Sequence, residues 1–416
     1  MTGAPAHGLR NYAIVTAAYW GFTLTDGALR MLVLFTFFQL GYSPFTLALL
    51  FLLYEAAGIG ANFIGGWLAA RYGITRMLTV GLLTQIAGFL LLSVASPAWG
   101  STLLVTWVLL AQGVCGVAKD LTKTASKSAI KITEAQAGGE AEGRLFRWVA
   151  WFTGSKNAMK GVGFFLGGLL LQMVGFRMGL WLMAGALFLV MLGVVAALPA
   201  LMGKAKSSRS ARELFAKSRG VNLLALARVA LFGARDVWFV VGVPVFLYAN
   251  GWTFTGVGAF LALWTIGYGL MQAAAPAVVS RSADGLSREV PAARGWSLAL
   301  AIVPVLIAGA LALTPPDPAL VLVAGLAVFG VAFAVNSSVH SYLVLAYAGS
   351  EKAAEDVGFY YAANAAGRFM GILASGFLYQ LGGITACLLG SAVMLFLCWF
   401  VTLALPTRTE PQSVPA

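Results

Sequence analysis

Two lysines lie four residues apart inside a long apolar run, in the segment KNAMKGVGFFLGGLLL that begins at Lys156. Residues four apart share one face of an α-helix, so the side chains of Lys156 and Lys160 would lie side by side. A charged side chain among apolar residues is costly and usually faces a cavity or an opposite charge. Two cations on one face need an anion close by, so this spacing predicts an anion-binding site.

Other cationic and polar side chains interrupt apolar runs in a similar way. Asn364 and Arg368 repeat the four-residue spacing of the two lysines, and an arginine can bind phosphate-like oxygens with two parallel hydrogen bonds. Arg30 and Arg235 lie within further apolar runs. The residues predicted to contact an anionic substrate are Lys156, Lys160, Arg235, Arg368, Arg30 and Asn364.

Acidic residues and one histidine accompany these cations. The candidates for proton coupling or for ion pairs that orient the cations are Asp26, Glu55, Asp236 and His340. Asp26 lies four residues before Arg30, so an intrahelical ion pair with a purely structural role is an equal alternative. Arg235 and Asp236 are adjacent and would not face each other on a helix, so each is expected to have another partner.

The apolar runs contain more cations than carboxylates. The eight cations are Arg30, Lys119, Lys123, Lys156, Lys160, Arg228, Arg235 and Arg368. The four carboxylates are Asp26, Glu55, Asp120 and Asp236. With His340 neutral, eight minus four leaves a surplus of about four positive charges in a low-dielectric region. A multiply charged anion would compensate this surplus, whereas Lys123, close to an expected helix end, is more simply interpreted as interfacial.

The composition indicates which elements must carry these charges. Of the 416 residues, 60% are hydrophobic and 10% are charged, against about 25% charged residues in an ordinary soluble domain. Together with a mean hydropathy of +0.86, these values exclude a soluble globular enzyme, a disordered chain and a secreted disulfide scaffold. They indicate a multi-pass membrane protein. No cofactor or metal site is predicted, because the sequence has only two histidines and its three cysteines lie in apolar runs.

Twelve segments are apolar and long enough to cross a membrane as α-helices, for which about 20 residues are needed. They are residues 11–40, 45–70, 76–95, 102–125, 146–174, 177–201, 221–248, 254–280, 295–313, 318–346, 357–381 and 384–405. The predicted fold class is all-α, with twelve transmembrane helices in two pseudo-symmetric six-helix halves. Every third segment lacks interior charges, which is typical of lipid-facing helices, so the other eight would line a cavity.

The distribution of lysine and arginine among the connections predicts the orientation. The connections after the even-numbered segments carry nearly all of these residues, whereas those after the odd-numbered segments carry only Arg177. Cytoplasmic loops are enriched in lysine and arginine. Both termini are therefore predicted to be cytoplasmic. The net charge of +12 is explained by this topology, and no nucleic-acid partner is expected.

The chain also contains an internal repeat. The aligned pairs are Asp26 with Asp236 and Gly41 with Gly251 at an offset of 210, and Lys156 with Asn364, Lys160 with Arg368, Gly163 with Gly371 and Gly175 with Gly383 at an offset of 208. These matches predict two homologous halves, residues 1–202 and 221–416, joined by a cytoplasmic loop of residues 203–220. In transporters built from such repeats the substrate site lies between the halves.

Twelve spans, two halves and a basic central loop resemble the major facilitator superfamily. Its signature after the second span, Gly-x-Leu-Ala-Asp-Arg-x-Gly-Arg, corresponds here to GWLAARYGI, residues 66–74. Arg71 and Gly73 keep the signature and are expected to form a gating loop. Ala70 replaces the aspartate and Ile74 replaces the second arginine, so the salt bridge usually made by that aspartate is not expected.

Five longer runs resemble a narrower family, the organoarsenical efflux permeases of the ArsJ type. They are NYAIVTAAYWGFTLTDGALRMLVL (11–34), GYSPF (41–45), AKDLTKTASKSAIK (118–131), TGSKNAMKGVGFFLGG (153–168) and ARDVWFVVG (234–242). The resemblance implies arsenate resistance through export of 1-arseno-3-phosphoglycerate. Glyceraldehyde-3-phosphate dehydrogenase makes this adduct when arsenate replaces phosphate, so this enzyme is the implied functional partner. The protein is expected to act as a monomer in the lipid bilayer of a bacterial inner membrane.

Two other functions would use some of the same residues. A major facilitator carrier for another phosphorylated three-carbon acid or a sugar phosphate would use the same cations. A membrane enzyme acting on lipid phosphates would need a nucleophile or a metal cluster. The sequence has neither a Ser-His-Asp grouping at credible spacing nor a metal motif such as HExxH. We therefore predict a transporter and not an enzyme.

Overall fold

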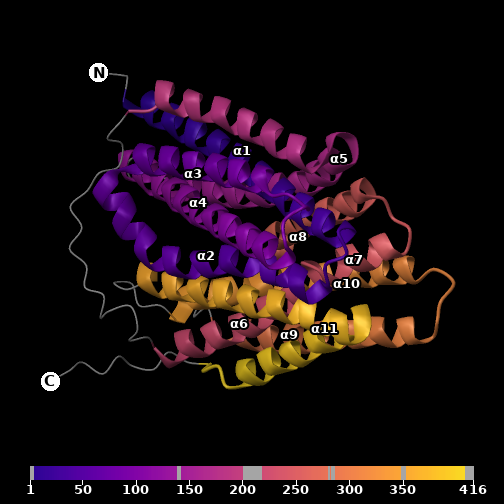
Figure 1. Cartoon of the computed structure of the whole chain (residues 1–416). Helices are drawn as coiled ribbons and strands as arrows, with labels where there is room; N and C mark the ends of the chain where they lie inside the picture. Colours follow the sequence, from indigo (N-terminus) through magenta and orange to yellow (C-terminus); the bar gives the residue numbers. More distant parts are fainter. Residues whose placement is uncertain are drawn as a thin grey trace. The chain divides into compact units, whose positions relative to one another are not determined.

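The computed structural model describes residues 4–137, 142–199, 218–279, 282, 286–347 and 353–407 (Figure 1). Within these ranges the regular elements are all α-helices, and no strand occurs. In lipid the backbone polar groups of a single segment must be satisfied within that segment, which favours helices. The predicted all-α fold class is confirmed, whereas most of the predicted central loop, residues 203–220, lies outside the described residues.

Eleven helices follow one another along the described chain. The first five are α1 (Ala4–Gln39), α2 (Pro44–Tyr72), α3 (Ile74–Val94), α4 (Ser101–Ala137) and α5 (Glu142–Ala197). The others are α6 (Arg219–Phe239), α7 (Gly242–Ala249), α8 (Phe254–Val278), α9 (Glu289–Ala312), α10 (Pro318–Tyr347) and α11 (Ala353–Leu403). Several of them begin or end within a few residues of a predicted segment, and two combine a pair of predicted segments.

The helices α5 and α11 are long enough to cross a membrane twice. Their apolar stretches, Ser155–Ala197 and Ala362–Leu403, contain 43 and 42 residues. Each helix bends where glycine leaves the helical conformation, at Gly175 (φ 78°) and at Gly383 (φ 61°). Nine helices of the described chain are long and apolar enough to span a membrane. Two of these nine, α5 and α11, each contain two predicted segments, and α2 accounts for one further segment. The structure therefore agrees with twelve spans.

The predicted seventh segment, residues 221–248, is interrupted. Residues 240 and 241 lie outside both α6 and α7, although the stretch Arg219–Ala249 as a whole is long and apolar enough to cross a membrane. The backbone N–H groups of Val241 and Gly242 both donate to the buried hydroxyl of Ser375, each at 3.3 Å. A break inside a membrane helix is tolerated where a side chain satisfies the freed backbone groups in this way.

The same turn follows the first span of each predicted half. Gly41 (φ 83°) and Gly251 (φ 86°) adopt left-handed conformations that favour glycine. Tyr42 and Trp252 each donate a backbone hydrogen bond to the carbonyl oxygen five residues earlier, at 3.2 and 3.1 Å. Because the two glycines are 210 residues apart, these turns support the internal repeat predicted from the sequence.

Packing divides the chain into two compact units. The first unit comprises Met1–Arg209 and Val243–Gly269, and the second comprises Ser210–Gly242 and Leu270–Ala416. The first unit therefore includes α7 and most of α8. The rings of Phe35 in α1 and Phe254 in α8 lie 4.8 Å apart, and Gly161 of α5 packs against Ala262 of α8.

One helix pair in each unit makes especially extensive contact. In the first unit α1 packs against α5, and in the second unit α6 packs against α11. A methyl group added at Gly163 of α5 would collide with the carbonyl oxygen of Leu24 in α1. In the same way, a methyl group at Gly371 of α11 would collide with the carbonyl oxygen of Gly233 in α6. Small residues allow such close approach of two membrane helices. Since the repeat aligns Gly163 with Gly371, the same helix contact is built twice.

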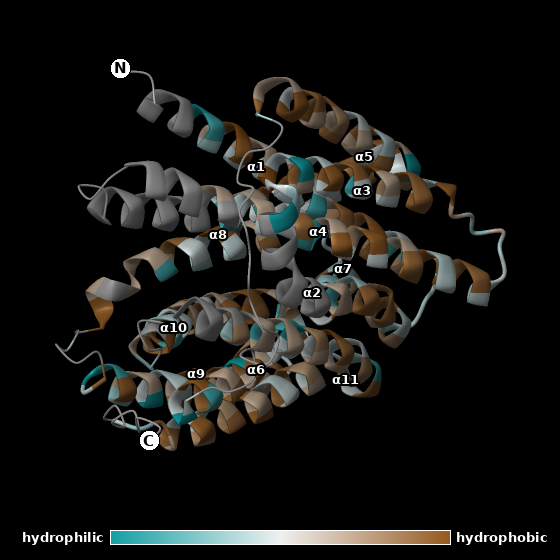
Figure 2. Ribbon diagram, turned by 90° about the vertical axis from the view of Figure 1, so that its left-hand side faces the viewer, coloured by the Kyte–Doolittle hydropathy of each residue, from teal (hydrophilic) through white to brown (hydrophobic). Residues whose placement is uncertain are grey.

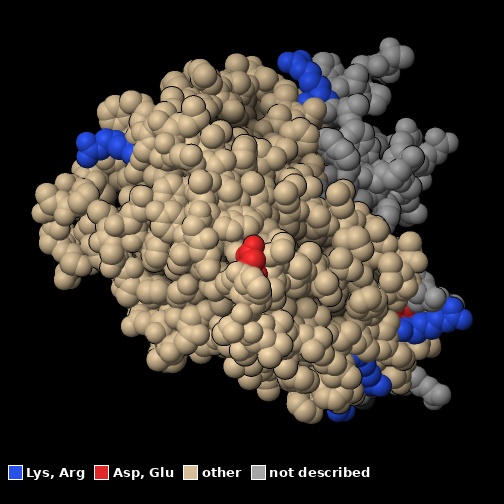
Figure 3. Space-filling view, turned by 90° about the vertical axis from the view of Figure 1, so that its right-hand side faces the viewer, with Lys and Arg blue, Asp and Glu red and all other residues tan. Residues whose placement is uncertain are grey.

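Large apolar side chains are exposed on the helices predicted to face lipid. Leu83 of α3, Leu189 of α5, Leu306 of α9 and Phe400 of α11 are between 47% and 69% exposed. The hydropathy colouring in Figure 2 shows that apolar residues dominate most helices, and charged side chains are sparse on the face drawn in Figure 3. An apolar surface of this kind suits contact with lipid, so the chain is a multi-pass membrane protein.

Candidate functional site

Glu55 of α2 binds two cations in the first unit. The Nη2 group of Arg30 in α1 donates to Glu55 Oε1 at 2.9 Å, and Lys119 Nζ of α4 lies 3.4 Å from Oε2. The side chains of Glu55 and Arg30 are 2% and 7% exposed. Buried charges of this kind are tolerated when they are paired. In this Glu55 cluster, formed by Arg30, Glu55 and Lys119, one negative charge is shared by two positive charges.

Tyr54 of α2 connects the Glu55 cluster to Asp26 of α1. Its hydroxyl donates to Asp26 Oδ1 at 2.5 Å, and its ring centre lies 3.9 Å from Lys119 Nζ. The guanidinium carbon of Arg30 lies 5.7 Å from the same ring centre, so both cations gain from the electrons of the ring. The structure therefore gives Asp26 and Arg30 separate partners in place of the intrahelical ion pair considered from the sequence.

Lys156 and Lys160 are half-buried on α5, in the same unit as the Glu55 cluster. The carbonyl oxygen of Lys160 packs against Gly27 of α1, so this turn of α5 lies beside the α1 residues that include Asp26. Lys160 Nζ lies 5.7 Å from the ring centre of Phe164. Because Lys156 lies one turn earlier on the same helix face, both lysines belong to the side of α5 that meets α1.

Asp236 of α6 binds two cations in the second unit. The Nε group of Arg235 donates to Oδ1 at 2.6 Å, and the Nε group of Arg368 in α11 donates to Oδ2 at 3.2 Å. Asp236 is 1% exposed, whereas the two arginine side chains are 15% and 20% exposed. We call these three residues the Asp236 cluster. It too shares one negative charge between two positive charges.

The contact between Arg235 and Asp236 corrects one expectation. Adjacent residues on a helix point in different directions, so each of these residues was expected to have a partner other than its neighbour. Asp236 does have such a partner in Arg368, but it also binds Arg235 directly. The physical reason is the length of the arginine side chain, which folds back along the helix surface until its guanidinium reaches the neighbouring carboxylate.

Asn364 and His340 were also predicted as site residues. Asn364 is half-buried one turn before Arg368, and its Oδ1 has no hydrogen-bond partner among the described residues. His340 of α10 is fully buried and interacts electrostatically with Arg228. The structure thus places Asn364 on the helix that supplies Arg368, and it groups His340 with an arginine outside the Asp236 cluster.

The sequence does not single out Tyr54 and Lys119 as site residues, although both contact the charges of the first unit. Lys119 is recognisable as a cation in an apolar run, but its partner depends on how α2 and α4 pack. Tyr54 carries a weak signal, since it directly precedes Glu55 in an apolar run. A buried tyrosine hydroxyl usually has a hydrogen-bond partner, and a nearby carboxylate is a strong one.

The predicted gating loop is a tight connection between α2 and α3. α2 ends at Tyr72, and Gly73 has a φ of 84° before α3 begins at Ile74. This left-handed conformation explains the glycine of the signature. Arg71 is exposed, and its guanidinium carbon lies 5.6 Å from the ring centre of Tyr72. The gating role of Arg71 and Gly73 stays a prediction.

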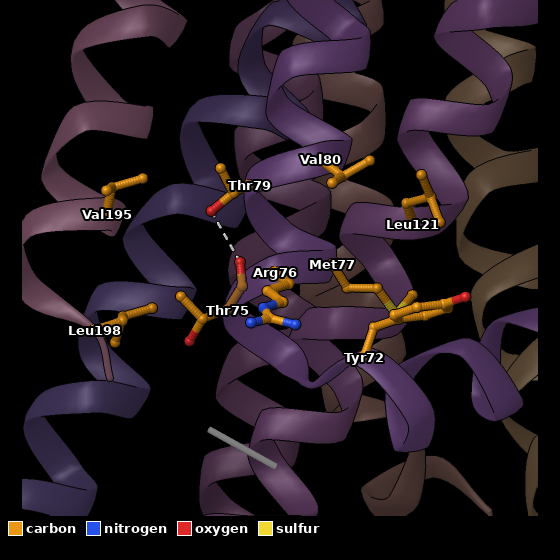
Figure 4. Close-up of a pocket in the computed structure, with 9 residues that line it drawn as sticks. All are labelled: Tyr72, Thr75, Arg76, Met77, Thr79, Val80, Leu121, Val195 and Leu198. Atoms are coloured by element: carbon orange, nitrogen blue, oxygen red, sulfur yellow. Dashed lines mark hydrogen bonds between the residues drawn. The ribbon is translucent and has the colours of Figure 1, made fainter. Parts of the chain in front are cut away.

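A cavity of about 540 Å³ lies in the first unit near this loop (Figure 4). The described residues that line it are Tyr72, Thr75, Arg76, Met77, Thr79, Val80, Leu121, Val195 and Leu198. This lining is mostly apolar, with Arg76 as its charged residue, and it includes none of the predicted substrate-contacting residues. Such a lining does not suit a polyanion.

Several solved structures have a similar backbone, whereas no family model and no curated protein matches the sequence. The nucleoside transporter NupG is similar with a TM-score of 0.72 and 15% identity, over 96% of this chain and 99% of that chain. A bacterial homologue of the iron transporter ferroportin in the inward-facing state has a TM-score of 0.71 and 14% identity, over 95% and 98%. A POT family transporter in complex with 5-aminolevulinic acid has a TM-score of 0.71 and 13% identity, over 95% and 95%.

Likeness at this level of identity concerns the fold. It extends over nearly the whole length of each chain, so it includes all the described helices. The glycine turns and glycine contacts repeated between the two predicted halves fit the same architecture. This chain therefore has the major facilitator fold.

Proposed function

We propose that this protein is a secondary active transporter that exports an anionic organoarsenical, 1-arseno-3-phosphoglycerate, from the cytoplasm by alternating access. The observation that carries the proposal is that each of the buried carboxylates Glu55 and Asp236 is shared by two cations. In both clusters two cations meet one carboxylate in a region largely shielded from water. A multiply charged anion would add negative charge beside these cations, whereas a neutral or cationic substrate would not.

The predicted contact residues supply several cations for the acidic groups of this substrate. Arg235 and Arg368 offer planar sets of N–H donors that fit phosphate or arsenate oxygens. Lys156 and Lys160 add two charges from α5. Arg30 is the most buried of the predicted contacts, and its guanidinium already binds a carboxylate, so the substrate would compete with that carboxylate for it.

Protonation of a shared carboxylate would link proton binding to anion binding. Asp236 illustrates this link: when it is ionised, its charge competes with the substrate for Arg235 and Arg368. When Asp236 is protonated, both arginines lose their counter-charge and bind an anion more tightly. Such coupling is reciprocal, so anion binding also favours protonation. Asp26, Glu55 and His340 are the other candidates for this role.

The direction and the cellular setting of transport rest on the sequence. The cations of the even-numbered connections support a bacterial inner-membrane protein with both termini in the cytoplasm. Glyceraldehyde-3-phosphate dehydrogenase would produce the substrate on the cytoplasmic side, and the transporter would act as a monomer. The resistance follows from removal of the adduct, since it hydrolyses outside the cell.

Growth of an arsenate-sensitive bacterium tests the proposal. Cells that express both the protein and the dehydrogenase should grow at arsenate concentrations that stop cells expressing either one alone. Arg368→Met should abolish the protection. Arg177→Met is the matched control, because Arg177 donates to the Ser93 carbonyl oxygen, belongs to neither cluster and should not be needed.

Two outcomes would contradict the arsenical substrate. One is protection that does not require the dehydrogenase, and the other is resistance to arsenite in place of arsenate. Transport of a phosphorylated three-carbon acid or a sugar phosphate without arsenate protection would support the other carrier, since that carrier would use the same cations.

A further inference from the structure

Arg228 of α6 is a buried cation of the second unit that belongs to neither charge cluster. It is 3% exposed, and its guanidinium carbon lies 4.0 Å from the ring centre of Phe232 and 4.7 Å from that of Tyr360. Its Nη1 group donates to the carbonyl oxygen of Ser337 in α10 at 3.2 Å and to the Ser337 hydroxyl at 3.0 Å. All of these contacts are neutral, and no carboxylate among the described residues forms an ion pair with Arg228.

Several buried polar atoms near Arg228 lack a hydrogen-bond partner among the described residues. Among the described residues, Arg228 Nε, Asn336 Nδ2 and both ring nitrogens of His340 lack a hydrogen-bond partner, and all are buried. Asn336, Ser337 and His340 lie within about one turn of α10. The hydroxyl of Ser297 in α9 donates to Asn336 Oδ1 at 3.3 Å, which leaves the amide N–H groups of Asn336 available as donors.

The chemistry of this group of atoms is that of an anion site. Arg228 Nε–H, the Asn336 amide and one ring N–H of His340 are donors, and the arginine adds a positive charge that no described carboxylate balances. Buried cations are normally paired with a negative charge, and buried donors with an acceptor. One small anion among the three side chains would meet both needs, whereas a water molecule would leave the charge uncompensated.

The burial of these three side chains limits the size of the ligand that they could hold. Arg228 is 3% exposed, and Asn336 and His340 are 0% exposed. A ligand held by these three side chains would be enclosed by the helices of the second unit. A three-carbon substrate with two acidic groups is too large for such a position, whereas a monatomic halide needs little more room than a water molecule.

We propose that Arg228, Asn336 and His340 bind a small inorganic anion of the size of chloride within the second unit. The anion neutralises Arg228 and links α6 to α10, and through Ser297 it links both to α9. It stabilises the second unit and does not take the place of the exported substrate. This inference goes beyond the proposed transport function, and it stands whatever the transported substrate is.

Thermal unfolding of the purified full chain in detergent tests this site. Tryptophan fluorescence would follow unfolding at constant ionic strength in sodium chloride, sodium bromide, sodium phosphate or sodium gluconate. We expect chloride and bromide to raise the unfolding midpoint in a saturable manner, because a ligand that binds only the folded state stabilises it. An identical midpoint in chloride and gluconate would overturn the proposal, as would stabilisation by phosphate alone.

Three variants locate the effect. Arg228→Gln should abolish the halide dependence, and Asn336→Leu should weaken the apparent halide affinity while keeping the cation. Arg294→Gln is the matched control, because Arg294 of the same unit donates to the backbone carbonyl oxygens of Thr402, Leu403 and Leu405. It should keep the full halide dependence. Retention of that dependence in Arg228→Gln would contradict the site.

A structural measurement keeps the proposal testable if Arg228→Gln does not fold. Crystals of the unaltered full chain grown in bromide should show an anomalous scattering peak between the side chains of Arg228 and Asn336. Absence of that peak at saturating bromide would overturn the proposal. Since neither measurement involves transport, failure here is distinguishable from failure of the proposed export of an organoarsenical.

Discussion

In the first unit the carboxylate shared by two cations comes from α2, whereas in the second unit it comes from α6, the counterpart of α1. The repeat aligns Asp236 with Asp26, but Asp26 accepts a hydrogen bond from the Tyr54 hydroxyl and forms no ion pair with a described residue. At the same offset of 210, Glu55 aligns with Thr265, which carries no charge. The two units therefore share a backbone plan and differ in the placement of their charges.

This difference separates what the fold requires from what a ligand would require. The glycines of the turns and of the close helix contacts recur at aligned positions, because both predicted halves need the same backbone geometry. The charged residues recur only in part, since Asp236 aligns with Asp26 and Arg368 with Lys160. The carboxylate that two cations share in the first unit does not recur, because Glu55 aligns with Thr265. The fold therefore explains the repeated glycines, whereas the placement of the charges is particular to each unit.

Neutralising the shared carboxylates should have the largest effect on stability. Glu55→Gln and Asp236→Asn each leave two cations without a counter-charge, and removal of one partner from a buried ion pair costs about 3–5 kcal/mol of unfolding free energy. We expect the larger loss for Glu55→Gln, because Arg30 is 7% exposed whereas Arg235 and Arg368 are 15% and 20% exposed. Unfolding midpoints in detergent measure both losses. A larger loss for Asp236→Asn would contradict this ranking.

Removal of the Tyr54 hydroxyl should test the contact that Asp26 makes and that its aligned counterpart Asp236 lacks. Tyr54→Phe deletes the hydrogen bond to Asp26 but keeps the ring beneath Lys119. A hydrogen bond to a charged group is worth about 1.5–3 kcal/mol, so we expect a loss in that range in unfolding free energy. The control is Tyr42→Phe, at a tyrosine whose ring packs on Phe37 in the turn after α1. Equal losses in both variants would show that the Asp26 contact is unimportant.

The two aligned turns should respond alike to a single added methyl group. Gly41→Ala and Gly251→Ala each force a residue with a side chain into a left-handed conformation, which costs about 1–2 kcal/mol. A Cβ at either position meets no atom within 4 Å, so the effect is conformational alone. Gly309→Ala, in the last turn of α9 and also in open space, is the control and should not destabilise. Clearly unequal losses at the two turns would argue against equivalent geometry.

Much of the fold could be predicted from the sequence because it depends on local properties. The length of an apolar run determines whether it can cross a membrane, and the bends at Gly175 and Gly383 fall where turn residues separate predicted segments. The glycine pairs of the repeat can be read directly from the sequence, because they occur at constant offsets. The break between α6 and α7 could not be predicted in this way, because it depends on Ser375, which is 134 residues from Val241.

The candidate site could be predicted as a set of residues but not as a set of contacts. Cations in apolar runs stand out in any sequence, so Arg30, Arg235 and Arg368 were identified from their surroundings alone. Their partners depend on how helices pack and on how far a side chain reaches. Arg30 binds Glu55 across two helices, and Arg235 folds back onto its own neighbour in the sequence.

The most direct test of an anion transporter is uptake into everted membrane vesicles. The dehydrogenase would generate the arsenylated adduct in the medium, and vesicle-associated arsenic would be measured for the unaltered protein and for Lys156→Met and Lys160→Met. Loss of one charge-assisted contact, at about 1.5–3 kcal/mol, predicts a decrease of roughly tenfold or more in apparent affinity for each variant.

Arg177→Met is the control for this measurement, because Arg177 donates to the Ser93 carbonyl oxygen and its loss leaves no described carboxylate without a partner. The account predicts that vesicles with Lys156→Met or Lys160→Met take up far less arsenic at low substrate concentration, while Arg177→Met vesicles match the unaltered protein. Full uptake by both Lys156→Met and Lys160→Met would contradict the claim that the cations of α5 bind the transported anion.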